Sequence, residues 1–184
     1  MARSSVHKRR SSLDFRPPRV SYLRDPGSAA YADGMEARKI SVWRSSYRVT
    51  DRGREIAVWD SSVWKSGGHF ELDGQRYQVR SNAWGNKYTM TDDSGAAIAS
   101  ADRVGRKRWT VEAAGETYHF RRKSMWGNEE ELLLGDNAVG SVRKTSFWRG
   151  DIAAELPTLT PAMQLFVLGV IISRWEAQAA SSGG

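Results

Sequence analysis

The fold is decided by the run LPTLTPAMQLFVLGVIISRW, residues 156–175. Thr160 is suited to cap a helix and Pro161 to occupy its first position, so we expect a helix over about 161–177. Its apolar side chains fall on every side, which excludes a surface helix with one wet face. A tail-anchored membrane span is one interpretation, but prolines, threonines and a glutamine shorten the apolar part. We favour the other interpretation, a helix that fills the lumen of a β-barrel.

An internal repeat with a period of about 41 residues organises the chain before this helix. It is marked by WGN at 84–86 and at 126–128, by Gly74 and Gly115, and by YRVTD at 47–51 and YTMTD at 88–92. Three copies of about four short strands favour one closed barrel, because propellers typically need four or more blades.

Apolar and polar side chains alternate with period two from Arg38 onward, as expected for half-buried strands joined by short turns. The fold class we expect is all-β with one helix: a closed antiparallel barrel of about twelve strands, built from three four-stranded repeats and enclosing the C-terminal apolar helix. The barrel should span residues 37–178, followed by a flexible tail at 179–184.

Most of the excess positive charge lies near the N-terminus. The net charge is +7, and residues 1–25 contain seven Lys or Arg against two Asp, which gives +5. Residues 1–36 have too few apolar side chains to form a core, so we expect a basic, mostly extended or disordered arm. Its cations are predicted to dock on a surface or a partner: Lys8, Arg9, Arg10, Arg16 and Arg19.

Catalytic motifs are lacking. The chain has no cysteine, and its three histidines have no partners at metal-ligand spacing. We therefore expect no catalytic residue, no metal, no cofactor and no small-molecule substrate. The first ten residues lack the apolar run of a secretory signal, and a cytoplasmic location is expected.

Basic clusters recur at related places in the repeats and could gather on one side of the barrel, where they would attract phosphates. The residues predicted to bind anions or lipids are Arg103, Arg106, Lys107, Arg108, Arg121, Arg122, Lys123, Arg143 and Lys144. Trp84 and Trp126 are predicted to pack in the core or against turns, so a stacking platform for nucleic acid ranks behind an anionic lipid.

The chain from Arg38 to Ala177 resembles the tubby-like barrel superfamily, which includes the tubby C-terminal domain, phospholipid scramblases and LURP-one-related proteins. The resemblance rests on the strand repeats and on LPTLTP at 156–161 leading into 163–175. It implies a twelve-stranded barrel around a buried helix, in a class whose best-understood members dock on anionic lipids. The phosphoinositide motif of tubby and the cysteine-rich and calcium-binding segments of scramblases have no counterpart here.

The function we expect is that of a non-enzymatic binding module that docks reversibly on an anionic surface, such as phospholipid head groups at the inner membrane face. One alternative is a structural or accessory subunit that docks on a larger protein assembly through its N-terminal arm. Another is a tail-anchored membrane protein.

Overall fold

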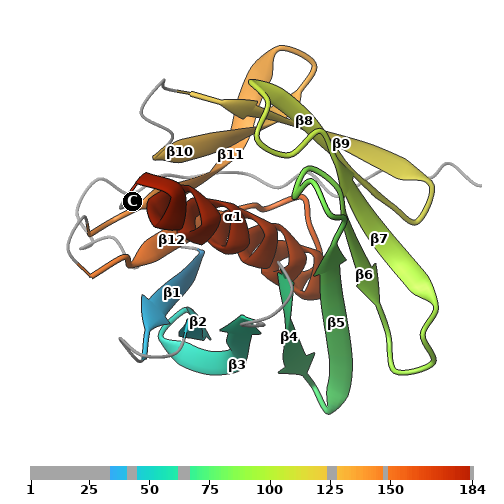
Figure 1. The fold of residues 1–184 in the computed structure, drawn as a ribbon, viewed down its shortest axis with the longest axis vertical. Coiled ribbons are helices and arrows are strands. Elements are labelled where there is room, and N and C mark those ends of the chain that lie inside the picture. The colour runs from blue at the N-terminus through green and yellow to red at the C-terminus, as the bar shows by residue number, and fades with distance from the viewer. Residues whose placement is uncertain (1–33, 41–44, 62–66, 124–127, 147–148, 183–184) are drawn as a thin grey trace, which may run out of the picture. The chain divides into compact units, whose positions relative to one another are not determined.

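The computed structural model describes residues 34–40, 45–61, 67–123, 128–146 and 149–182. They form a closed antiparallel barrel around one helix (Figure 1). The strands are β1 (Met35–Lys39), β2 (Ser46–Asp51), β3 (Arg54–Ser61), β4 (Gly67–Leu72), β5 (Gln75–Ser81), β6 (Tyr88–Thr91), β7 (Ala97–Asp102), β8 (Arg108–Ala113), β9 (Glu116–Arg122), β10 (Glu129–Leu134), β11 (Asn137–Lys144) and β12 (Ile152–Glu155), and the helix is α1 (Pro161–Ser182). The predicted fold class is confirmed. The arm cations Lys8, Arg9, Arg10, Arg16 and Arg19 lie outside the described residues.

The three repeats are arranged unequally around the barrel. Strands β2–β5 form one unit and β6–β9 a second, but the third contains only β10–β12 before the chain enters α1. Its missing fourth place is taken by β1, which pairs with β12 from Met35↔Ala154 to Ala37↔Ile152 and also pairs with β2. The first strand therefore closes the barrel.

Short hairpin turns explain why the strands follow one another directly. Asp73-Gly74 and Ala114-Gly115 lie one period apart, and all four residues have positive φ, at 53° and 79° and at 51° and 81°. Two successive residues with positive φ define the type I′ turn, whose twist matches that of paired strands. Glycine at the second place of each turn adopts this conformation without a Cβ penalty.

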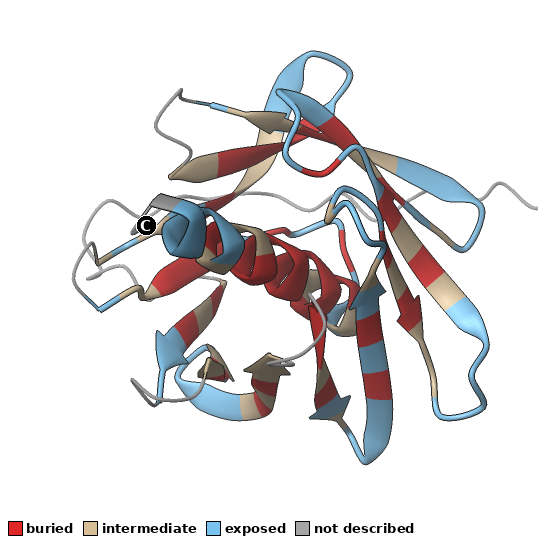
Figure 2. Cartoon of the chain, viewed as in Figure 1, coloured by how far each residue is buried: buried red, intermediate tan, exposed pale blue. Residues whose placement is uncertain are grey.

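The helix α1 lies within the barrel, and its apolar middle is buried on all sides (Figure 2). Residues 165–173 are all buried. The helix begins at Pro161 as predicted and continues to Ser182, beyond the predicted end near 177, because Ala179 and Ala180 are strong helix formers. Among the described residues, no helix is long and apolar enough to cross a membrane.

Trp59 of β3 fixes the distance between the barrel wall and α1. Its ring packs against Gly169 of α1, where an added Cβ would overlap the ring carbons, and a Cβ at Gly68 of β4 would lie 2.7 Å from Cζ2 of the same ring. Trp59 is 1% exposed. Two glycines on neighbouring elements thus make room for this large buried indole.

The prediction that Trp84 packs in the core or against a turn is wrong. Trp84 is 87% exposed, on the loop of residues 82–87 between β5 and β6. The side chain of Asn82 accepts hydrogen bonds from the backbone N–H groups of Asn86 and Lys87, at 3.1 and 3.2 Å. Because these bonds hold the loop, it needs no aromatic packing. Trp126 lies outside the described residues.

Candidate anion-binding site

A groove of about 520 Å³ lies on the outside of the barrel, beside the β10–β11 turn. We call it the basic groove. Its lining comes from the β7–β8 turn, β8, β9 and the β10–β11 hairpin: Arg103, Arg108, Trp109, Thr110, His119, Phe120, Leu133, Gly135 and Asp136. Two guanidinium groups, a hydroxyl and an imidazole therefore border one space.

The register of β9 and β10 explains the groove. These strands pair only from Arg122↔Glu130 to His119↔Leu133, and β10 then continues into the β10–β11 turn. The β10–β11 turn does not pair with β9, so a space remains between the turn and β9. Leu133, which is 7% exposed, supplies an apolar lining residue there.

Arg108 borders the basic groove, and its ion pair with Asp136 is weak. Its guanidinium lies 4.0 Å from a carboxylate oxygen of Asp136, and the two side chains are 66% and 94% exposed. An ion pair so exposed contributes at most about 1 kcal/mol. An incoming anion can therefore replace Asp136 at Arg108 at little cost.

Thr110 and His119 border the groove from neighbouring strands, because they are directly opposed in the β8–β9 register. Neither Thr110 nor His119 is among the residues predicted to bind anions. The signal was available: on β8, Thr110 lies between the buried Trp109 and Val111, so period-two alternation turns it outward.

The turn of residues 103–107, which we call the basic turn, is fixed from several sides. Val104 is 5% exposed, and its N–H donates to the Asn86 carbonyl at 2.9 Å. The guanidinium of Arg122 donates to the carbonyl of Gly105. Held in this way, the basic turn presents three predicted cations to solvent: Arg103, Arg106 and Lys107.

A second predicted cluster is neutralised by the neighbouring strand β10. Arg121 pairs with Glu131 at 2.7 Å, Arg122 faces Glu130 at 3.7 Å, and Lys123 pairs with Glu129 at 2.9 Å. The hydrogen bond and charge of Glu129 raise the pKa of Lys123. An anion would have to compete with three carboxylates here, so these cations are a poorer site than the basic turn.

The third predicted cluster, on β11, is occupied as well. Arg143 lies 3.7 Å from a carboxylate oxygen of Glu155. The Lys144 ammonium lies over the Trp175 ring, 4.8 Å from its centroid, and burial lowers its pKa. The geometry thus favours Arg103, Arg106, Lys107 and Arg108 among the predicted anion-binding residues.

A buried polar network that the sequence analysis missed joins the barrel wall to α1. Glu130 is fully buried, and its carboxylate accepts hydrogen bonds from Trp109 Nε1 at 3.0 Å and from the guanidinium of Arg174. Burial lowers the pKa of Arg174, and the charge of Glu130 opposes that shift. Glu130 itself has no contact with solvent, so the role of the network is to fix the helix rather than to bind a ligand. An arginine beside a long apolar helical run and a glutamate at an inward strand position were the available signals.

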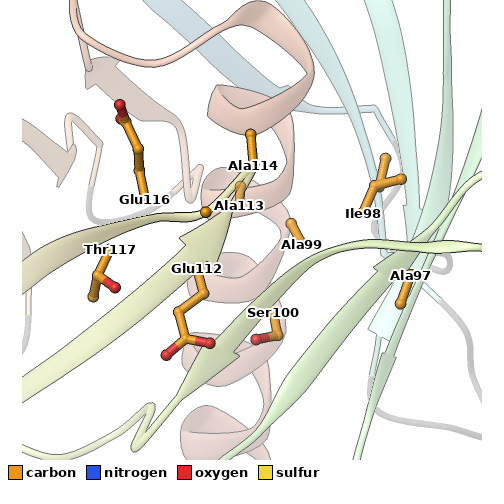
Figure 3. A pocket seen from close by; sticks show the side chains of 10 residues that line it. Ala97, Ile98, Ala99, Ser100, Glu112, Ala113, Ala114, Glu116 and Thr117 are labelled. Carbon is orange, nitrogen blue, oxygen red and sulfur yellow. The ribbon is translucent and has the colours of Figure 1, made fainter.

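A second hollow, of about 350 Å³, lies between β7 and the β8–β9 hairpin (Figure 3). Small apolar side chains line it, together with Ser100, Thr117 and the carboxylates of Glu112 and Glu116. Two carboxylates and no cation make it unsuited to an anion. Within the described part of the chain, no group of three histidine, aspartate or glutamate side chains could hold a metal ion.

No protein-family model, no curated protein and no solved structure matches the chain.

Proposed function

We propose that this protein is a tubby-like barrel that works as a non-enzymatic binding module and docks reversibly on anionic phospholipid head groups through the basic groove. The observation that carries the proposal is the convergence of Arg103, Arg108, Thr110 and His119 on one open space of about 520 Å³. The space is large enough for a phosphate-bearing head group, and its polar lining is mostly cationic or neutral.

The chemistry of the lining suits a phosphate. A guanidinium offers two parallel N–H donors to phosphate oxygens, and both Arg103 and Arg108 line the groove. The hydroxyl of Thr110 and the ring N–H of His119 supply further donors. Asp136 is the one carboxylate in the lining, and its exposed position lets it swing away from Arg108.

Charge around the groove supports docking on a surface rather than capture of a free ion alone. Arg106 and Lys107 project from the basic turn next to Arg103. Each basic residue near an anionic membrane contributes about 1 kcal/mol, so the groove, the turn and the basic arm sequence together would hold the protein reversibly. The inner membrane face carries the anionic lipids, so the proposed location is cytoplasmic and peripheral.

The architecture is compatible with a binding role on the outer surface. A closed barrel with one C-terminal helix is the plan that the tubby-like resemblance implies, which supports the proposed kinship. The helix also fills the lumen, since its middle residues 165–173 are all buried, and this leaves little room for a substrate inside.

Vesicle sedimentation tests the proposal, with phosphatidylcholine alone compared with a two-to-one mixture of phosphatidylcholine and phosphatidylserine. We expect the full chain to sediment only with the anionic vesicles and to be released by salt. The double variant Arg103→Glu and Arg108→Glu should lose binding. The control is the double variant Arg54→Glu and Arg76→Glu, which changes the net charge by the same amount at exposed positions on β3 and β5. This control should keep most of the vesicle binding.

Equal loss in both double variants would show that net charge acts without the groove, and negligible binding of the unmodified chain would end the proposal. Inorganic phosphate, added as a competitor at constant ionic strength, separates the two sources of phosphate. Release at low phosphate concentration would point to a free anion as the natural ligand instead of a lipid.

A further inference from the structure

The most exposed large apolar side chain recorded in the described residues is Trp84, at 87% exposure. It stands on the loop of residues 82–87, which we call the Trp84 loop. A tryptophan this exposed leaves a large apolar ring in water, and contact with a partner or a membrane interface would bury it.

The Trp84 loop holds one shape through its own hydrogen bonds. The backbone N–H of Asn82 donates to the Lys87 carbonyl at 2.9 Å, and the side-chain amide of Asn82 donates to the side-chain oxygen of Asn86 at 2.8 Å. Gly85 follows Trp84 with φ of 65°, a conformation that glycine adopts freely. The exposure of Trp84 is therefore built into the turn.

Exposed cations lie on the same loop as Trp84 and on the turn that is hydrogen-bonded to it. Lys87 is exposed on the same loop, and the Asn86 carbonyl accepts the Val104 N–H at 2.9 Å, which joins the loop to the basic turn. Within the described residues, no ion pair links Lys87, Arg103, Arg106 or Lys107 to a carboxylate. The loop that carries Trp84 and the turn that carries three of these four cations are thus directly hydrogen-bonded to each other.

We propose that the Trp84 loop inserts into the head-group region of an anionic phospholipid bilayer while Lys87 and the basic turn contact the lipid phosphates. This inference rests on the proposed function and adds an apolar anchor to it. Tryptophan concentrates at the boundary between head groups and acyl chains, where its ring is buried and its N–H stays hydrated. Lysine and arginine beside it gain from the negative surface potential.

This combination selects a membrane over nucleic acid as the occupant. Single strands are bound by several aromatic side chains on which successive bases stack. Here one exposed indole stands on one short loop, which also carries Lys87 and is hydrogen-bonded to the basic turn. An isolated anchor of this kind binds a bilayer only together with charge, so binding stays reversible.

The test compares Trp84→Ala and Trp84→Phe with the unmodified full chain on vesicles of two parts phosphatidylcholine to one part phosphatidylserine. We expect Trp84→Ala to lower the partition coefficient about tenfold, because the indole no longer leaves water, and Trp84→Phe to lower it less. Ile40→Ala is the matched control, since Ile40 is 47% exposed just after β1, outside the groove lining and the Trp84 loop, and should change binding little.

Quenching by brominated phosphatidylcholine in the same vesicles reports insertion directly. The chain contains eight tryptophans, so the signal of Trp84 is the quenching that Trp84→Phe loses. If the unmodified chain binds anionic vesicles but Trp84→Ala binds equally well and Trp84→Phe loses no quenching, the insertion is refuted and the groove proposal survives. If the unmodified chain does not bind, both fail. Stronger binding of Trp84→Ala than of the unmodified chain would also refute insertion.

Discussion

Trp59 occupies the space that a side chain at Gly169 would need. Gly169 lies in the middle of α1, where a glycine costs about 1 kcal/mol of helix stability relative to alanine. Closer packing offsets that cost, because the indole of Trp59 can then approach the backbone of α1. A residue that weakens the helix locally is what allows the barrel to close tightly around it.

We predict that Gly169→Ala destabilises the protein despite the better helix propensity of alanine. The new methyl group overlaps the Trp59 ring, and overpacking of a dense core costs typically about 1–3 kcal/mol. Urea unfolding measures the change. Combining Gly169→Ala with Trp59→Phe should recover part of the loss, and strictly additive effects of the two changes would show that the two residues are not in conflict.

Arg174→Met should destabilise the barrel by about 3–5 kcal/mol, because it leaves the carboxylate of Glu130 buried without its closest cation. Adding Glu130→Gln removes that charge and should restore part of the stability. Thermal unfolding of the two single variants and the double variant provides the comparison. Destabilisation by the double variant equal to the sum of the single variants would mean that Glu130 and Arg174 act independently.

Alkaline pH should weaken the fold through two buried tyrosines. Burial raises the pKa of Tyr88, and burial together with the hydrogen bond to Glu176 raises the pKa of Tyr47. The folded state therefore keeps both phenolic protons at pH values where the unfolded chain loses them, above about pH 10. The free energy of unfolding should be unaffected by these groups below that pH and should fall above it.

Urea unfolding between about pH 8 and pH 11 checks this dependence. The double variant Tyr47→Phe and Tyr88→Phe should show a shallower decline than the unmodified chain, although its stability at neutral pH is lower because the Tyr47 hydroxyl no longer donates to Glu176. An unchanged slope in the variant would assign the alkaline loss to other groups.

We predict that residues before β1 can be deleted without loss of the barrel, whereas a deletion that includes β1 destabilises it. Deletion of residues 1–39 removes β1 and leaves the pairing edges of β2 and β12 open, whereas deletion of residues 1–33 keeps β1. The longer deletion should lower the midpoint of thermal unfolding and promote aggregation far more than the shorter one. Light scattering during heating distinguishes them, and identical profiles would show that β1 is dispensable for closure.

Repetition and the apolar run at 156–175 were sufficient to predict the barrel and the enclosed helix. A helix that is apolar on every side needs apolar surroundings, and alternating strands can provide them. The way the barrel closes was beyond such reasoning, since the repeat pattern does not say that β1 completes the third unit.

The site was less predictable than the fold. Basic clusters can be read from the sequence, but whether Arg121 is available for a ligand depends on its position opposite Glu131, which is a matter of register. The repeat of WGN favoured packing of Trp84 in the core or against a turn, and that prediction was wrong. The exposure of Trp84 follows from hydrogen bonds that the Asn82 side chain makes within the loop.

The pairing of Met35 with Ala154 joins residues that leave the ribosome at very different times. During synthesis, β1 can align with β2 early, while its other edge waits until β12 has emerged. Of the barrel strands, β1 is thus made first and finds its second partner last, so the barrel cannot close before β12 has been made. Contacts across so long a stretch of chain slow folding and lengthen the time during which open edges can meet other chains.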